Sequence, residues 1–190
     1  MDYICTDNIT AEQYHTAYQA MDSVRKARCD RLRDNEAKRL CIAADMLARK
    51  MLAKEIKTTP ESLEFYTDPN GKPFVKGYDI NFSVSHSGNI AMCAVSHYPI
   101  GADIELVCDP PERVMKRVCP NGCGTRRFFE IWTMTESYGK LTGKGVANAL
   151  SNLKLEFNGN QIKSNIEQCL FLTVPCPNGY IASLCIKKSP

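Results

Sequence analysis

Residues 80–106 constrain the fold more than any other part of the chain. They contain three apolar-rich stretches, at 80–84, 90–96 and 100–106, and only a few residues separate each stretch from the next. Antiparallel strands can be joined by such short turns, whereas parallel strands need a crossover of about a dozen residues or more. The sequence therefore predicts a run of antiparallel strands joined as hairpins.

Two helical patterns accompany these strands. Within residues 22–56 the apolar positions recur at spacings of four and three, as on one face of a helix, and a break into two helices is expected near Asp34. A second helix is predicted over residues 125–142, where glycines end it. Residues 107–124 are rich in proline and glycine and are predicted to be mostly loop.

Further strands follow the second helix. Residues 153–157 alternate apolar and polar side chains and lead into the turn Asn158-Gly159, and strands are predicted near 168–174 and 180–186. The order is then helix, three strands, helix, three strands. This order predicts an α+β fold with two similar halves.

Composition narrows the class of protein. The net charge of +3 is too small to indicate nucleic acid as a partner, and no apolar run approaches the roughly 18 residues of a membrane span. The first residues lack the basic start and apolar run of a signal peptide, so we expect the cytoplasm and reduced thiols. Among the ten cysteines, Cys119 and Cys123 have metal-like spacing; a plain Gly/Pro turn is the simpler interpretation and a zinc site the alternative.

Two acids share one face of the predicted strand at residues 100–106. Gly101, Asp103 and Glu105 alternate with apolar residues and so point to the same side. Two carboxylates at this spacing can reach one cation, and oxygen ligands without a nearby histidine or thiolate favour Mg²⁺ over zinc. Taken alone, the motif is also typical of a half-buried strand with one wet, acidic face.

The predicted second helix carries a matching row of side chains. Trp132, Glu136 and Lys140 are spaced by four and so line one face. A glutamate four residues before a lysine is usually a weak surface ion pair. The functional alternative is that Glu136 completes a three-carboxylate metal site and that Lys140 binds a phosphate.

Two further features could bind phosphate. Residues 25–39 hold seven cationic side chains, which would suit a phosphate ligand, although interleaved acids favour a solvated helix face. His86 is predicted in a turn rich in serine and glycine, where its side chain and the backbone N–H groups could donate to a phosphate. A turn histidine bonded to the local backbone is the alternative. His15 and His97 are predicted to be surface residues.

In combination, these motifs resemble those of the 4′-phosphopantetheinyl transferases, specifically the surfactin-type branch of monomeric, two-lobed enzymes. Each motif alone is weak, but four in the family's order with sensible spacing are a strong signal. The matching pieces span about residues 71–145: Gly71-Lys72-Pro73, Asn81 to Gly88, Ile100 to Glu105, and Trp132 to Lys140 closed by Gly143-Lys144-Gly145.

The resemblance implies a fold and a reaction. The fold would have two lobes related by a pseudo-twofold axis, residues 1–99 and 100–190, each a helix packed on a small, mainly antiparallel sheet, with the active site in the cleft between them. The reaction would move the 4′-phosphopantetheine arm of coenzyme A to a serine of an apo acyl or peptidyl carrier protein and release 3′,5′-ADP. Mg²⁺ would be the cofactor, with Mn²⁺ as an alternative. The partners would be coenzyme A and a carrier protein, with no nucleic acid and no membrane, and the protein would be a monomer.

The resemblance also implies roles for individual residues. The metal would be held by Asp103, Glu105 and Glu136, and Lys140 would bind the pyrophosphate. The coenzyme A contacts would be Arg25, Arg28 and Arg39 at the 3′-phosphate, Ser85 and His86 at the other phosphates, and Gly71, Lys72 and Pro73 along the adenine.

The chain departs from the family pattern in two places. The family usually has a lysine directly before the helix glutamate, whereas this chain has Thr135, so Thr135→Lys is expected to improve the use of coenzyme A. The family also often carries a further glutamate before the second helix, thought to help deprotonate the serine. Glu112, Asp109 and Glu130 are the candidates here, Glu105 or a metal-bound water are alternatives, and the base stays unassigned. The alternative function is a degenerate module that binds coenzyme A or a carrier protein without transfer.

Overall fold

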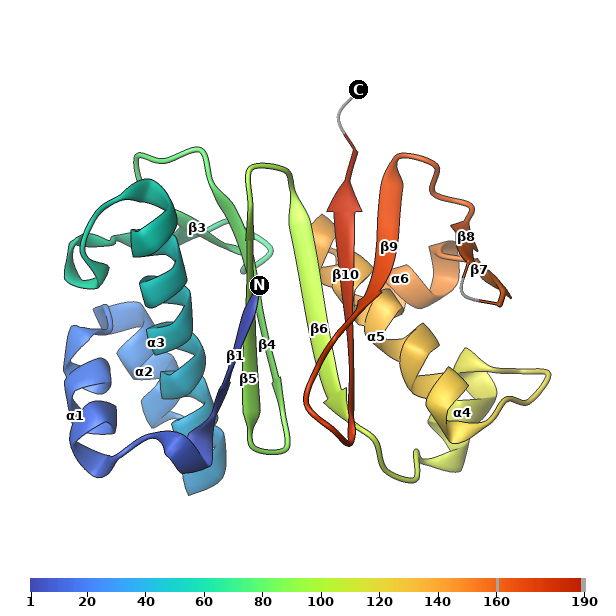
Figure 1. The fold of residues 1–190 in the computed structure, drawn as a ribbon, viewed down its shortest axis with the longest axis horizontal. Coiled ribbons are helices and arrows are strands. Elements are labelled where there is room, and N and C mark those ends of the chain that lie inside the picture. Colours follow the sequence, from blue (N-terminus) through green and yellow to red (C-terminus); the bar gives the residue numbers. More distant parts are fainter. Residues whose placement is uncertain (160, 189–190) are drawn as a thin grey trace. The chain divides into compact units, whose positions relative to one another are not determined.

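The computed structural model describes residues 1–159 and 161–188, and the chain divides into two compact units, Met1–His97 and Tyr98–Pro190. The division falls two residues before the boundary expected from the sequence. Each unit combines a long helix with a small antiparallel sheet, so the predicted α+β class is confirmed (Figure 1). In the described residues, no helix is both long and apolar enough to cross a membrane.

The first unit is built on a three-stranded antiparallel sheet with β5 in the middle, in the order β1-β5-β4. The long helix α3 packs on this sheet, and α1 and α2 pack on α3 (Figure 1). The strands β2 and β3 form a separate pair. The elements are β1 (Asp2–Cys5), η1 (Thr6–Asn8), α1 (Ala11–Ala20), α2 (Ser23–Asp30), α3 (Asn35–Ile56), η2 (Pro60–Ser62), β2 (Phe65–Thr67), β3 (Pro73–Val75), β4 (Asn81–Ser87) and β5 (Ile90–Ser96).

The local sequence explains where α3 begins and what it buries. The carboxylate of Asp34 accepts hydrogen bonds from two backbone N–H groups of the first turn, so the helical pattern breaks here, as predicted. Leu47 and Leu52 lie on the apolar stripe and are buried with Phe82 of β4 and Cys93 of β5. Burial of this stripe against the sheet holds the first unit together.

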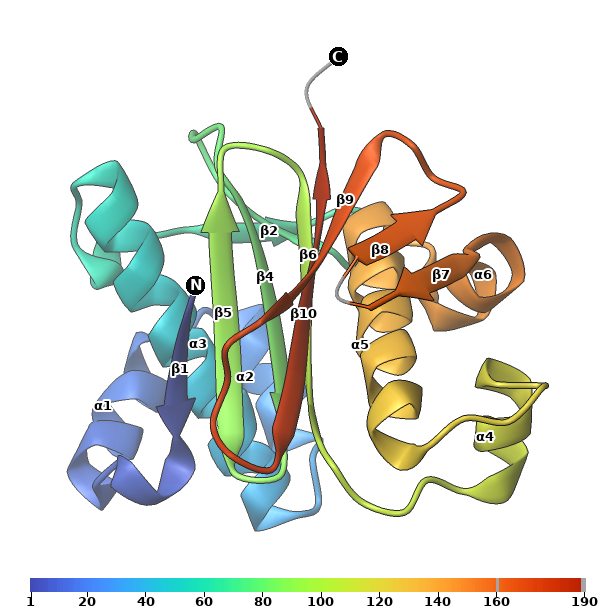
Figure 2. The same cartoon turned by 45° about the vertical axis from the view of Figure 1, so that its right-hand side comes forward.

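The second unit is also built on a three-stranded antiparallel sheet. The strand order is β6-β10-β9, with β10 in the middle. The helix α5 packs on β6 and β10, and α6 packs on α5 (Figure 2). The elements are β6 (Ile100–Leu106), α4 (Glu112–Val118), α5 (Thr125–Thr142), α6 (Gly145–Asn152), β7 (Leu155–Asn158), β8 (Gln161–Ser164), β9 (Cys169–Val174) and β10 (Tyr180–Lys187).

Some local predictions are wrong. The strands β5 and β6 do not form the predicted hairpin, because β1 and β4 already occupy both edges of β5, and β6 pairs with β10 instead. Part of the predicted loop 107–124 is the helix α4. Gly143 ends α5 in a left-handed conformation, as predicted, but α6 begins two residues later. Apolar periodicity also misses α1, although Thr10 and Gln13 form a capping box that the sequence contains.

Candidate active site

The helix α5 lies directly against the face of β6 that carries the two acids. A Cβ atom at Gly101 would collide with the backbone oxygen of Ser137 on α5. The backbones of strand and helix therefore approach as closely as only glycine permits. This approach places α5 over Asp103 and Glu105, which share the face of Gly101.

The row of side chains on α5 meets the acids of β6 in reverse order. The indole Nε1–H of Trp132 donates to Oε1 of Glu105 over 3.2 Å. Two turns later along α5, Nζ of Lys140 donates to Oδ1 of Asp103 over 2.7 Å. Glu136 stands between the two cross-element contacts on the same helical face. The strand motif and the helix motif of the sequence therefore belong to one site, because the row of side chains on α5 faces the acids of β6.

The electrostatics of Glu136 reflect these neighbours. Burial raises the pKa of its carboxyl above the ordinary value, and the negative charge of Asp103 raises it further. Lys140 opposes this shift and Glu105 adds slightly to it. Glu136 therefore takes up a proton more readily than an exposed glutamate does.

The acids do not meet as a ready-made metal cage. In the part of the chain that the structure describes, no three histidine, cysteine, aspartate or glutamate side chains are arranged so that they could hold a metal ion. Asp103 is buried, and its Oδ1 is paired with the ammonium of Lys140. As folded, the site is an arrangement of carboxylates around one lysine.

Two of the base candidates lie in ion pairs. Glu130 on α5 contacts Arg127 over 2.7 Å and Arg126 over 3.3 Å. Glu112, the first residue of α4, contacts Lys116 over 2.7 Å on the exposed side of that short helix. Asp109 lies in the loop that joins β6 to α4. None of these contacts links a candidate to the acids of β6.

The surroundings of position 135 bear on one prediction made from the sequence. Thr135 is buried, with 3% of its surface exposed, and its hydroxyl donates to the backbone oxygen of Ile131 over 2.8 Å. The expectation that a lysine here would reach a phosphate assumed an accessible helix face. Because the position is buried, the ammonium of a lysine could reach a phosphate only if the surrounding side chains repacked.

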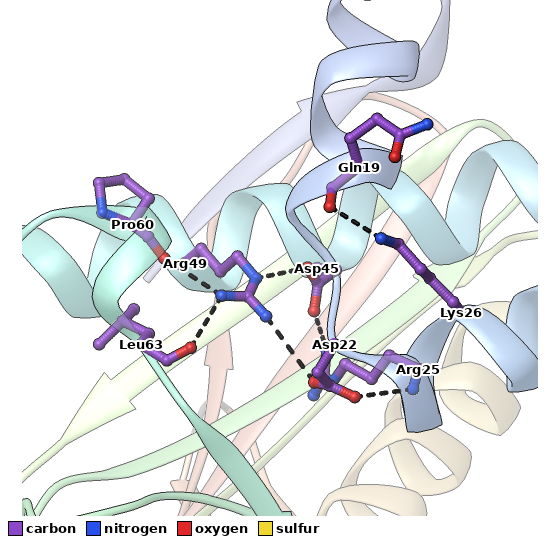
Figure 3. Close-up of polar contacts among 8 residues, drawn as sticks. All are labelled: Gln19, Asp22, Arg25, Lys26, Asp45, Arg49, Pro60 and Leu63. Atoms are coloured by element: carbon purple, nitrogen blue, oxygen red, sulfur yellow. Dashed lines mark hydrogen bonds and ion pairs between the residues drawn. The ribbon is translucent and has the colours of Figure 1, made fainter.

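The basic stretch of the first unit is partly tied up within the protein. Arg25 on α2 is held at both ends: its backbone N–H donates to Asp22, and Nη1 donates to Oδ1 of Asp45 on α3 over 2.5 Å (Figure 3). Its guanidinium also lies over the ring of Phe65, 4.7 Å from the centroid. Arg28, one turn further along α2, is exposed.

A buried ionic network surrounds Arg25, and sequence reasoning missed it. Asp45 is 1% exposed and also accepts from Nε of Arg49 over 2.8 Å (Figure 3). Nη1 of Arg49 donates to the carbonyls of Pro60 and Leu63, and Nη2 lies 3.7 Å from Asp22. The signal that could have revealed it is an aspartate and an arginine four residues apart inside the apolar stripe of α3.

Arg39 of α3 is also engaged locally. Its Nη2 donates to the backbone oxygen of Thr6 over 3.2 Å, and the guanidinium lies 5.0 Å from the ring centroid of Tyr14. The side chain keeps 41% of its surface exposed. The guanidinium of Arg39 is therefore held by the protein on one side and exposed to solvent on the other.

The serine and histidine of the predicted phosphate contact lie on a strand rather than in a turn. Ser85 and His86 belong to β4, opposite Met92 and Ala91 of β5. The turn consists of the next residues, where Gly88 has a left-handed φ of 56°. Ser85 is buried and His86 is exposed. Strand alternation explains why neighbouring residues differ in this way. His15 and His97 are exposed, as predicted.

The Gly71-Lys72-Pro73 segment follows a turn closed by Asp68. One carboxylate oxygen of Asp68 accepts from the backbone N–H groups of Asn70, over 2.9 Å, and Lys72, over 2.8 Å. Gly71 takes a left-handed φ of 84°, which the turn requires. Pro73 then begins β3.

Cys119 and Cys123 form a disulfide. The expectation of reduced thiols is therefore wrong for this pair, and so is the zinc alternative, since a zinc site needs both thiolates free. The bridge closes the turn between α4 and α5, next to buried Phe128 and Phe129.

Comparison with known proteins shows which proteins the chain is similar to. Residues 8–98 match the family described as 4′-phosphopantetheinyl transferase, N-terminal. The chain is 29% identical over 159 residues to 4′-phosphopantetheinyl transferase gsp of Aneurinibacillus migulanus, covering 76% of this chain and 67% of that protein. It is 28% identical over 183 residues to a 4′-phosphopantetheinyl transferase of Bacillus subtilis (87% and 82%). It is 24% identical over 178 residues to 4′-phosphopantetheinyl transferase Sfp of Bacillus subtilis strain 168 (85% and 80%).

An α+β fold with acids and a lysine gathered between β6 and α5, matched by transferases over most of the chain, defines a group-transfer enzyme. Over most of its length the chain resembles the 4′-phosphopantetheinyl transferases, as the motifs indicated.

Proposed function

We propose that the protein transfers the 4′-phosphopantetheine arm of coenzyme A to a serine of an apo acyl or peptidyl carrier protein and releases 3′,5′-ADP. The observation that carries this proposal is the row Trp132, Glu136 and Lys140 of α5 facing the acids of β6. The names of the relatives, all 4′-phosphopantetheinyl transferases, support the same reaction. A cytoplasmic monomer without a nucleic-acid partner is part of the proposal, in keeping with the small net charge.

The chemistry of the three carboxylates fits Mg²⁺, with Mn²⁺ as the alternative. Asp103, Glu105 and Glu136 offer only oxygen, and the charges of Asp103 and Glu105 contribute to the raised pKa of Glu136. Mg²⁺ is commonly bound by one or two carboxylates, with water and substrate phosphate as the other ligands. A site completed by the pyrophosphate therefore needs no ready-made cage. When bound, the ion would offset negative charge on the leaving phosphate.

Lys140 and the arginines would position the donor. Lys140 would exchange Asp103 for the pyrophosphate, because its side chain is partly exposed and long. Arg25, Arg28 and Arg39 would bind the 3′-phosphate. In favour of Arg25, its Nε and Nη2 have no hydrogen-bond partner among the described residues, while Nη1 is held by Asp45.

The remaining contacts would come from the first unit. His86 is exposed and could donate to a phosphate, whereas Ser85 is buried and would contribute through the local strand geometry. Gly71, Lys72 and Pro73 would lie along the adenine. In the reaction, the carrier serine oxygen forms a new bond to phosphorus as the pyrophosphate bond breaks, and 3′,5′-ADP leaves with the bonding electrons. These chain contacts hold the donor in place for that displacement.

The second candidate is a module that binds coenzyme A or a carrier protein without transfer. The ion pair of Lys140 with Asp103 favours it, because this contact neutralises the carboxylate without any metal. The two candidates differ in what they do to a carrier protein, which decides between them.

The test is mass spectrometry of apo acyl and apo peptidyl carrier proteins after incubation with the protein, coenzyme A and Mg²⁺. Transfer adds the mass of one phosphopantetheine group. Asp103→Asn is nearly isosteric and should abolish the gain, whereas Asp109→Asn, in the loop after β6, tests a base candidate independently. A carrier mass that never changes, although coenzyme A binds, would support the binding module instead.

A further inference from the structure

Trp132 is the only tryptophan of the chain, and it contacts one of the acids of β6. The indole has one N–H donor and no acceptor, so a carboxylate is a matched partner for it. The bond to Oε1 of Glu105 is charge-assisted, which makes it stronger than a bond between neutral groups. It ties α5 to β6 at one end of the candidate site, while Lys140 and Asp103 tie them at the other.

Packing sets the direction of this N–H group. The ring of Trp132 stacks on Phe128, one turn earlier on α5, with centroids 6.1 Å apart and 10° between the planes. Phe128 is buried in a cluster with Phe129 and Ile181, against which Trp132 packs. Ile181 is the residue of β10 directly opposite Glu105. The ring is therefore held by neighbours other than the carboxylate that it contacts.

We propose that Trp132 is a positioning residue for Glu105 in the proposed metal site, and that its indole reports whether a divalent cation is bound there. A hydrogen bond to one carboxylate oxygen orients the whole group. Loss of a partner that orients a metal ligand typically costs about 10- to 100-fold in metal affinity. The inference rests on the proposed function, because it takes Glu105 to be a metal ligand, and it adds a residue that acts through that ligand.

The first experiment measures Mn²⁺ binding without turnover. Free Mn²⁺ is counted by electron paramagnetic resonance in the presence of the protein and coenzyme A, and the carrier protein is left out so that no transfer occurs. Trp132→Phe keeps an aromatic ring over Phe128 and removes the N–H. We expect about tenfold weaker Mn²⁺ binding in this variant. Its affinity for coenzyme A without metal should stay that of the wild type.

A matched variant controls for effects on the helix. Tyr138→Phe also removes a polar group from α5, but its ring packs near Phe171 of β9, away from the acids. It should bind Mn²⁺ as the wild type does. In transfer assays, a high Mg²⁺ concentration should restore the turnover of Trp132→Phe, since a positioning defect raises the Mg²⁺ requirement, whereas a folding defect is not rescued.

Fluorescence gives the second readout. Mg²⁺ titrated into the wild type with coenzyme A should change the emission of the single indole and saturate with binding. Glu105→Gln keeps an oxygen acceptor for the indole and removes the charge, so its emission should no longer respond over the same concentrations. An emission that ignores Mg²⁺ in the wild type contradicts the reporter role.

The outcomes separate the two proposals. If the wild type modifies a carrier protein and Trp132→Phe binds Mn²⁺ equally well, the positioning role is wrong and the proposed function stands. If Mn²⁺ affinity depends on Trp132 but neither type of carrier protein is modified, the proposed function fails and the positioning role stands. Absence of Mn²⁺ binding by the wild type, with and without coenzyme A, overturns the inference together with the metal part of the proposed function.

Discussion

The ammonium of Lys140 donates to Oδ1 of Asp103 over 2.7 Å and so joins α5 to β6. The Asp103 side chain is 4% exposed and that of Lys140 is 31% exposed. A buried carboxylate is costly without a counter-charge, and the lysine supplies one in the protein by itself. The same oxygen is one that a divalent cation would use, so lysine and cation compete for it.

This competition makes a prediction for Lys140→Met, which keeps an aliphatic stem and removes the charge. We expect tighter Mn²⁺ binding than in the wild type when coenzyme A is absent, since the rival cation is gone. We also expect about ten- to a hundredfold weaker binding of coenzyme A, because a charge-assisted phosphate contact is lost. Calorimetric titrations with each ligand measure both effects. Lys163→Met, at an exposed position of β8, should change neither. Weaker Mn²⁺ binding by Lys140→Met would contradict the competition.

Glu136 predicts a dependence of stability on pH. Burial and then the charge of Asp103 raise the pKa of Glu136 above its ordinary value of 4.5. The folded protein therefore holds a proton that the unfolded chain releases more readily, and stability is lost as the pH rises from 4.5 through the raised pKa. Glu136→Gln cannot titrate, so its melting temperature relative to the wild type should be higher at pH 7 than at pH 4. An equal difference at the two pH values, measured by thermal denaturation without metal, would rule this out.

The buried carboxylate of Asp45 is expected to matter for stability. It is shared by Arg25 and Arg49, so Asp45→Asn leaves buried Arg49 without its closest charged partner and with only the more distant Asp22. We expect a loss of about 3–5 kcal/mol in the free energy of unfolding, measured by urea denaturation. Glu64→Gln removes an acid from an ion pair with Lys76 in which both side chains are largely exposed, and should have no measurable effect. Similar losses in both variants would mean that burial is not the cause.

The side chains that meet in the candidate site could largely be predicted from the sequence, because strand and helix periods are local. Alternation assigned Asp103 and Glu105 to one face of β6, and four-residue spacing assigned Glu136 and Lys140 to one face of α5. That these two faces meet is a tertiary fact. The one local sign of it was Gly101, which shares the face of the acids and permits the close approach.

The sequence could not predict the contacts that depend on packing between distant segments. The pairing of Arg25 with Asp45 joins α2 to α3, and a basic helix gives the same pattern whether its cations face water or a buried acid. The pairing of β6 with β10 spans most of the second unit, whereas the short separator before β6 suggested a hairpin with β5. Burial at position 135 is likewise set by packing that the helical pattern alone does not reveal.

Gly101 should tolerate no side chain. An alanine Cβ would overlap the backbone of α5 at Ser137, so Gly101→Ala must push helix and strand apart. We expect a loss of about 1–3 kcal/mol in stability, as for overpacked cores, together with weaker Mn²⁺ binding because Asp103 moves relative to α5. Gly124→Ala is the control: it precedes α5 at an ordinary φ of −71°, and an added Cβ meets nothing within 4 Å. Equal effects of the two substitutions on urea denaturation would show that the close approach is unimportant.

The burial of Thr135 argues against an expectation drawn from the family pattern. From the sequence, Thr135→Lys should add a cation beside the donor, but the residue is 3% exposed and its hydroxyl bonds to Ile131 within α5. A lysine there would bury a charge or distort the packing, so we now expect lower stability and no gain in the use of coenzyme A. Thr135→Ser keeps the hydroxyl in a smaller side chain and should retain most of the activity. Steady-state kinetics against coenzyme A and thermal denaturation of both variants provide the check. A lower coenzyme A requirement in a stably folded Thr135→Lys protein would show that the lysine escapes to the surface and that the family pattern was the better guide.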